Sequence, residues 1–148
     1  MLTNSFSEKV INWYELHGRH DLQWRKAITP YRIWISEIML QQTQVVTVKP
    51  YFKKFIKKYP TLKSIQDASE DEILTLWSGL GFYKRARNIF QTKEIIHSEH
   101  NGRFPKNFEE IIKLPGIGKS TAGAIMSIAH QIPTPILDGN VKRTVSYT

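Results

Sequence analysis

One carboxylate lies in a strongly apolar segment, where its surroundings suggest acid chemistry. Glu37 is part of WISEIMLQQ, and its neighbours at helical spacing include Trp34 and Ile38. A carboxyl group removed from water is biased toward its protonated form, which suits a general acid. The alternative is a narrow polar stripe that Glu37 forms with Ser36 and Gln41, and the segment alone leaves both interpretations open.

A second signal is the glycine-rich segment LPGIGKS, which runs from Leu114 to Ser120. Gly116 and Gly118 allow backbone conformations closed to other residues, and such a turn exposes N–H groups at the start of the next helix. These groups can hold a phosphate oxygen, and Lys119 adds a positive charge at the same place. An ordinary two-helix turn is the alternative, but the full LPGIGKSTA context favours binding to a nucleic-acid backbone.

Two other runs carry groups that could act on a base stack. The amides of Gln41 and Gln42, which precede Thr43, could fill a gap between bases, and the rings of Phe82 and Tyr83 could wedge between them. Helix termini and core aromatic residues are the alternative, and they are the more common explanation of either run in isolation.

Helices must position all of these residues, because nearly every segment has a helical hydrophobic period and none alternates as a strand does. The fold class is therefore expected to be all-α. The expected N-caps are Ser5, Thr29, Thr43, Ser69 and Asn107. The expected helices span residues 5–17, 30–42, 44–59, 62–68, 70–78, 84–101 and 107–114, with the glycine hairpin and a further helix after them.

The last segment offers Asp138, in ILDGNV, as a catalytic carboxylate or simply as an N-cap, which is the usual role of Asp before Gly at a helix start. The helix it would begin stops almost at once. We therefore expect the chain to be C-terminally truncated.

Composition narrows the possible partners. The chain has 148 residues, 41% of them hydrophobic, which suits one compact domain. Its net charge of +8 favours a polyanion such as nucleic acid, although a lysine-rich surface that serves only solubility is the alternative. Without cysteine, the chain itself can form no disulfide, thiolate metal site or iron–sulfur site. It shows neither a signal peptide nor a membrane span, so the cytoplasm of a bacterium is the expected compartment.

Four motifs taken together, SEIMLQQTQV, WSGLGFYKRARN, LPGIGKSTAGAI and ILDGNVKR, closely resemble the adenine DNA glycosylases of the MutY family, from about Trp13 to Arg143. The resemblance implies a helix-hairpin-helix glycosylase fold. Residues 23–135 would form a six-helix barrel that includes the helix-hairpin-helix at about 108–130. Residues 1–22 would be the N-terminal helix of an incomplete second helical domain, and 136–148 a truncated segment with the catalytic Asp.

The resemblance also implies a reaction, in which adenine opposite 8-oxoguanine or guanine is flipped out of the duplex and its N-glycosidic bond is hydrolysed. Glu37 would protonate the leaving adenine, and Asp138, with Asn140 beside it, would stabilise the sugar cation. Trp24 and Arg25 would line the adenine pocket. Contacts with DNA would come from Gln41, Gln42, Thr43, Phe82, Tyr83, Gly116, Gly118 and Lys119.

Ser120 separates two branches of these enzymes, because the related endonuclease III-like lyases have a lysine nucleophile at its position. Serine cannot form a Schiff base, so the expected enzyme is monofunctional. A pyrimidine-lesion lyase is thereby disfavoured, whereas a non-catalytic helix-hairpin-helix DNA-binding remnant stays an alternative. The expected partner is duplex DNA with A:8-oxoguanine or A:G mispairs, and the expected state is a monomer without membrane contact.

The sequence departs from the family pattern at several points. Gln23 replaces the usual Pro, and Phe82 the usual Tyr, so that a ring is kept and a hydroxyl is lost. The resemblance implies a [4Fe–4S] cluster for a full-length protein, but its cysteine ligands are absent here.

Overall fold

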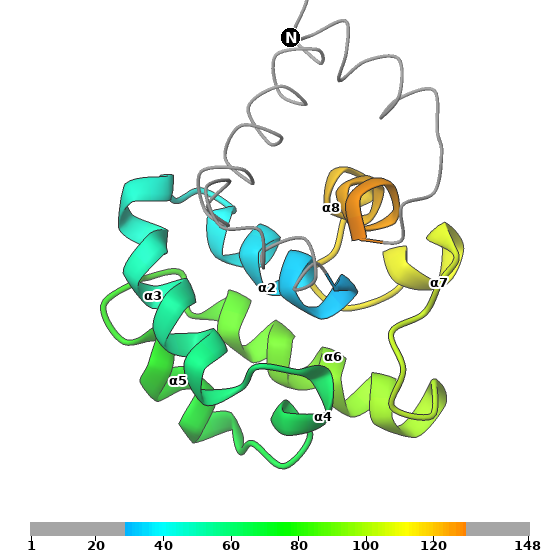
Figure 1. Ribbon diagram of the computed structural model, residues 1–148, viewed down its shortest axis with the longest axis horizontal. Coiled ribbons are helices and arrows are strands. Elements are labelled where there is room, and N and C mark those ends of the chain that lie inside the picture. Colours follow the sequence, from blue (N-terminus) through cyan, green and yellow to red (C-terminus); the bar gives the residue numbers. More distant parts are fainter. Residues whose placement is uncertain (1–28, 130–148) are drawn as a thin grey trace, which may run out of the picture.

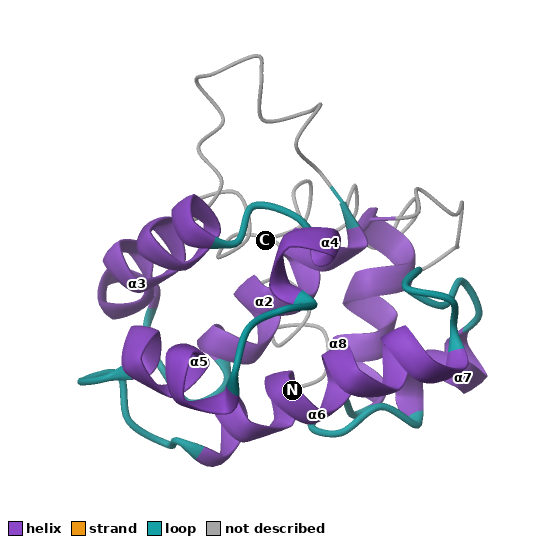
Figure 2. Cartoon of the chain, turned by 90° about the horizontal axis from the view of Figure 1, so that it is seen from below, coloured by secondary structure: helices purple, strands orange, loops and turns teal. Residues whose placement is uncertain are grey.

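The structure, a computed structural model, describes residues 29–129, and that range contains helices and no strand (Figures 1 and 2). The expected all-α class is confirmed there. The helices are α2 (Pro30–Leu40), α3 (Val45–Lys58), α4 (Leu62–Ile65), α5 (Glu70–Trp77), α6 (Lys84–Glu99), α7 (Phe108–Ile112) and α8 (Lys119–Ala124), which continues as a π-helical turn, η2 (Ile125–Ala129). None of these helices is long and apolar enough to cross a membrane.

Several predictions fall outside the described residues. They concern the N-terminal helix within residues 1–22, the segment 136–148, and the four site residues Trp24, Arg25, Asp138 and Asn140. The predicted domain boundaries therefore stay predictions.

Local capping chemistry determines where three helices begin. The hydroxyl of Thr29 accepts a hydrogen bond from the N–H three residues later, and Pro30 is the first residue of α2. At α5, Ser69 and Glu72 form a reciprocal capping box, with bonds of 3.1 and 2.9 Å. The Asn107 side chain caps α7 at 2.8 Å. These three predicted caps are confirmed, because each bond satisfies an N–H that has no partner within its helix.

Two boundaries around the first described loop were predicted wrongly. Helix α2 ends at Leu40 rather than at residue 42, because the backbone of Gln41 is extended, with a ψ of 117°, and Gln42 after it is left-handed, with a φ of 58°. Thr43 is not an N-cap, since Gln44 occupies that position before α3. The Thr43 hydroxyl instead donates to the carbonyl of Gln41 at 3.3 Å. The loop is therefore a distinct turn and not an extension of α2.

Three smaller predictions also need correction. The helix expected over residues 62–68 ends at Ile65, and the one expected to reach residue 114 ends at Ile112. The hydrophobic period of residues 84–100 also predicts that His97 shares one side of this helix with Ile89, Phe90 and Ile96, but His97 is exposed.

Helix α2 lies at the centre of the described fold, with α3 on one side and α8 on the other (Figure 1). It also packs against α6 and η2. Eight of its eleven residues are buried, and Ile33, Trp34, Ile35 and Met39 have no exposed surface. A helix that is apolar on nearly all sides is held by its neighbours along its whole length. The eight buried side chains of α2, Glu37 among them, are therefore closely surrounded by packed neighbours.

Candidate functional site

Glu37 occupies the middle of this central helix, and only 2% of its surface is exposed. Ser36 beside it is fully buried, and its hydroxyl donates to the Ile33 carbonyl at 2.8 Å. The burial expected for a general acid is therefore present at Glu37. Its role as an acid stays a prediction.

Gln41 lies one turn after Glu37 on the same side of α2 and links that helix to the glycine hairpin. Its amide nitrogen donates to the Gly116 carbonyl at 3.1 Å and lies 3.5 Å from the Thr121 hydroxyl. The amide group predicted to contact DNA thus contacts the hairpin in this structure. Gln42, the next residue, is exposed.

The predicted glycine turn between two helices is present, and it connects α7 to α8. Gly116 has a φ of 80°, and Gly118 directly precedes α8. Ile117 between them is buried and anchors the turn, while Lys119 and Ser120 are exposed at the first positions of α8. The turn therefore presents its backbone and a lysine to solvent, as binding to a phosphate requires.

The glycine–aromatic loop after α5 is a second exposed turn. Three of its residues have positive φ values, namely Gly79, Gly81 and Phe82. Phe82 is 58% exposed, which is unusual for so large an apolar ring. Inside the loop, the Gly79 N–H donates to the Tyr83 hydroxyl at 3.1 Å. The loop thus holds an aromatic ring outward on a compact frame.

Arg85, which the sequence analysis did not single out, is the side chain with the most contacts between these segments. It is 6% exposed and lies within hydrogen-bonding distance of five backbone carbonyl oxygens. Its spacing from the buried Ile89 and Ile96 puts it on the apolar stripe of α6. A charged residue at an apolar position of a helix is the sequence signal that could have identified Arg85 as a buried, hydrogen-bonded side chain. Burial lowers the pKa of its guanidinium from the ordinary value.

The structure therefore brings together most of the predicted site within the described range. The Gln41 amide joins the loop of residues 41–44 to the hairpin of residues 116–120. Arg85 joins the same loop to residues 81–82. The buried Glu37 lies one helical turn before this junction.

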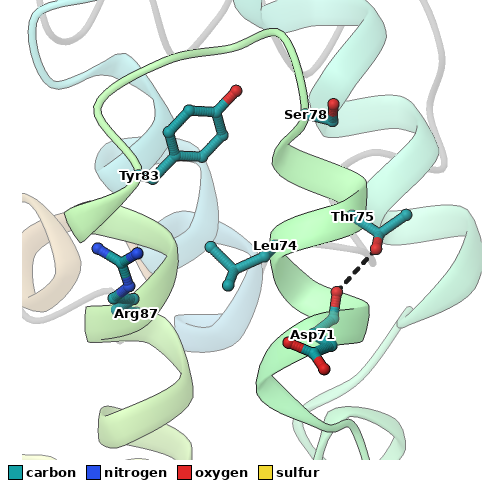
Figure 3. Close-up of a pocket in the computed structure, with 6 residues that line it drawn as sticks. All are labelled: Asp71, Leu74, Thr75, Ser78, Tyr83 and Arg87. Carbon is teal, nitrogen blue, oxygen red and sulfur yellow. Dashed lines mark hydrogen bonds between the residues drawn. The ribbon is translucent and has the colours of Figure 1, made fainter.

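A separate hollow of about 450 Å³ opens between α5 and α6 (Figure 3). Among the predicted site residues within 29–129, only Tyr83 lines it. In Figure 3 it is bordered by the polar side chains of Asp71, Thr75 and Arg87. Because Glu37 does not line this hollow, we do not assign it to the predicted chemistry.

Residues 29–129 contain no group of three or more His, Cys, Asp or Glu side chains arranged to hold a metal ion. The whole chain has no cysteine. Its own residues therefore do not fit the thiolate-bound cluster that the resemblance implies for a full-length protein.

Comparison with known proteins agrees with the resemblance. Residues 35–148 match the family described as HhH-GPD superfamily base excision DNA repair protein. The adenine DNA glycosylase of Buchnera aphidicola subsp. Schizaphis graminum is 55% identical over 138 residues, which are 93% of this chain and 40% of that protein. The human adenine DNA glycosylase is 39% identical over 95% of this chain and 27% of that protein. The chain thus spans well under half the length of these relatives.

Solved structures share the fold. A thermostable thymine-DNA glycosylase superposes with a TM-score of 0.66 at 30% identity, covering 87% of this chain and 59% of that one. A trapped endonuclease III–DNA covalent intermediate gives 0.65 at 24% identity, covering 89% of this chain and 60% of that one. The expected helix-hairpin-helix glycosylase fold is thereby confirmed.

Proposed function

Because the chain belongs to the HhH-GPD superfamily of base excision DNA repair proteins, we propose that it acts as a DNA glycosylase that hydrolyses adenine from mispairs with 8-oxoguanine or guanine. The observation that carries this proposal is the burial of Glu37 one turn before the junction of the exposed loops. Its relatives that bear the name adenine DNA glycosylase support the choice of base.

The proposed chemistry begins with adenine extruded from the duplex. Exposed Gln42 and Phe82 are suited to occupy the stack that the base has left. Glu37 then donates a proton to the adenine ring, so that the base departs as a neutral molecule and takes both electrons of the N-glycosidic bond. The sugar left behind carries a positive charge, which the carboxylate of Asp138 would stabilise. Water then adds to the sugar carbon and gives up one proton, which restores the acid form of Glu37 directly or through solvent, and an abasic site results.

Ser120 supports hydrolysis without strand cleavage. It is exposed at the start of α8, next to Lys119. A hydroxyl cannot form the imine through which lyases act on the abasic sugar. We therefore propose a monofunctional enzyme.

The test is a single-turnover assay of adenine release from duplexes that contain adenine opposite 8-oxoguanine, guanine or thymine. We expect release from the first two duplexes and not from the A:T control. Borohydride added during the reaction should trap no covalent protein–DNA adduct, and a trapped adduct would contradict the monofunctional assignment. Tight binding to DNA with no release from any duplex would instead show a DNA-binding module without catalysis.

The hairpin lysine offers an independent test of the proposed DNA interface. If Lys119 neutralises one phosphate, replacing it with alanine removes one counterion-release event. We therefore expect Lys119→Ala to reduce the slope of log binding constant against log salt by about 1. Lys63→Ala, an exposed lysine on α4, is the matched control and should leave the slope unchanged. Fluorescence anisotropy titrations at several salt concentrations measure both, and equal slopes for the two variants would remove Lys119 from the interface.

A further inference from the structure

We propose that Arg85 is a positioning residue that holds the two exposed loops, residues 41–44 and 79–83, in one fixed relation so that a base can be extruded between them and Glu37. The inference rests on the proposed function, since it assigns those loops to DNA. It adds a residue that touches neither base nor phosphate.

The guanidinium of Arg85 contacts both loops from one buried site. Its Nη1 atom lies 2.6 Å from the Met39 carbonyl oxygen, 2.8 Å from that of Gln41 and 3.1 Å from that of Ile38, all at the C-terminal end of α2. On the other side, Nη2 lies 2.9 Å from the Gly81 carbonyl oxygen, and Nε 3.3 Å from that of Phe82. One rigid planar group therefore spans both loops.

Three further contacts strengthen this assembly. The guanidinium lies 5.3 Å from the centre of the Trp77 ring and 5.4 Å from that of Phe82. The Trp77 indole N–H donates to the same Gly81 carbonyl at 3.1 Å. Positive charge beside the last carbonyls of α2 is also favourable because that end of the helix dipole is negative. The arrangement needs a planar cation with several donors, which arginine has and lysine lacks.

The conformations of the loop residues explain why a side chain that links the two loops is needed. Gln42 and Phe82 both have positive φ values, 58° and 49°, although neither is glycine. Residues other than glycine rarely adopt positive φ values, so contacts with the surrounding structure must stabilise these two conformations. These are the two residues proposed to enter the base stack. Gln42 directly follows Gln41, whose carbonyl oxygen Arg85 contacts, and Arg85 also contacts the carbonyl oxygen of Phe82 itself.

The experiment compares Arg85→Lys and Arg85→Met with the wild type, and Arg103→Met serves as the matched control. Arg103 is exposed and lies beyond the opposite end of α6. Three quantities are measured for each protein. They are the melting temperature, the affinity for an undamaged duplex, and the fluorescence rise of 2-aminopurine, an adenine analogue, placed opposite 8-oxoguanine at saturating protein.

Lysine can still place its ammonium against the α2 carbonyls, but a compact group cannot reach Gly81 and Phe82 as well. We therefore expect Arg85→Lys to recover most of the melting temperature that Arg85→Met loses. The extrusion signal should nevertheless fall about tenfold in both variants, because misplacement by about an ångström is sufficient for such losses. Affinity for the undamaged duplex should change little. A merely structural role would make melting temperature and extrusion recover together in Arg85→Lys, and that result would overturn the proposal.

Amide hydrogen exchange without DNA separates this proposal from the proposed function. Exchange in residues 41–44 and 79–83 should accelerate together in Arg85→Lys, and remain unchanged in Arg103→Met. If the wild type neither extrudes nor releases adenine, the proposed function fails, while faster exchange in both loops of Arg85→Lys still supports the positioning role of Arg85. Unchanged exchange in both loops of Arg85→Lys would overturn this role of Arg85, whether or not the protein releases adenine.

Discussion

Replacement of Glu37 by glutamine is expected to lower the single-turnover rate of adenine release by about 10²–10⁴-fold, the usual contribution of a positioned proton donor. Glutamine keeps the size of the side chain and its place within the buried centre of α2. It cannot donate a carboxylic proton, so adenine would have to leave as an anion. Affinity for the mispaired duplex should stay within a fewfold of the wild type.

The matched control for this substitution is Glu99→Gln, which makes the same chemical change at an exposed position in the last turn of α6. Both variants should show the helical circular dichroism of the wild type. A Glu37→Gln protein that released adenine at the normal rate would show that another group supplies the proton.

Replacement of Gly116 by alanine is expected to reduce both stability and DNA affinity. Its φ of 80° is unfavourable for alanine, and an added Cβ would lie 2.8 Å from the amide nitrogen of Asn88 and 3.1 Å from its Cβ. Strain of this kind costs about 1–3 kcal/mol. Relief of that strain by movement of the turn would lose charge-assisted contacts to phosphate, each worth about 1.5–3 kcal/mol. Duplex affinity should therefore fall by about tenfold or more.

Gly123→Ala, in the helix that follows the hairpin, is the control for the Gly116 substitution. Gly123 lies within α8, and a Cβ there would meet no atom of residues 29–129 within 4 Å beyond its own helix and chain neighbours. Alanine at this helical position should stabilise the protein by about 0.5–1 kcal/mol and leave binding unaltered. Thermal unfolding measures the stability of both variants, and fluorescence anisotropy titrations measure their affinity for duplex DNA. Equal affinities would mean that the backbone of the turn does not contact DNA.

Features set by neighbouring residues could be predicted from the sequence. The caps at Thr29, Ser69 and Asn107 depend on groups three residues away, so a short motif contains all the information needed. The glycine hairpin was predictable for the same reason. The apolar residues of its own helix allowed either burial of Glu37 or a narrow polar stripe, and the structure shows burial.

Features set by distant residues could not be predicted in this way. The carbonyls that Arg85 contacts at the end of α2 are 44 to 47 residues away in the chain. Gln41 and Gly116 are 75 residues apart. The end of α2 was misplaced by two residues because the left-handed turn at Gln42 is held by such contacts and not by a glycine. Tertiary structure therefore decided the loop geometry that local propensity left open.

The acceptors of Arg85 are all main-chain carbonyls, which has a consequence for how this protein tolerates mutation. Every amino acid except proline offers the same main-chain groups, so a substitution that keeps the backbone in place also keeps the hydrogen-bonding oxygen. Met39 has no exposed surface, so at that position only a residue of similar size meets this condition. Carbonyls do not ionise between acidic and alkaline pH, so the acceptors are also unaffected by the acidity of the medium. The donor groups therefore come from one side chain, whereas the acceptors depend only on the course of the backbone, which the packing of α2 and of the loop maintains.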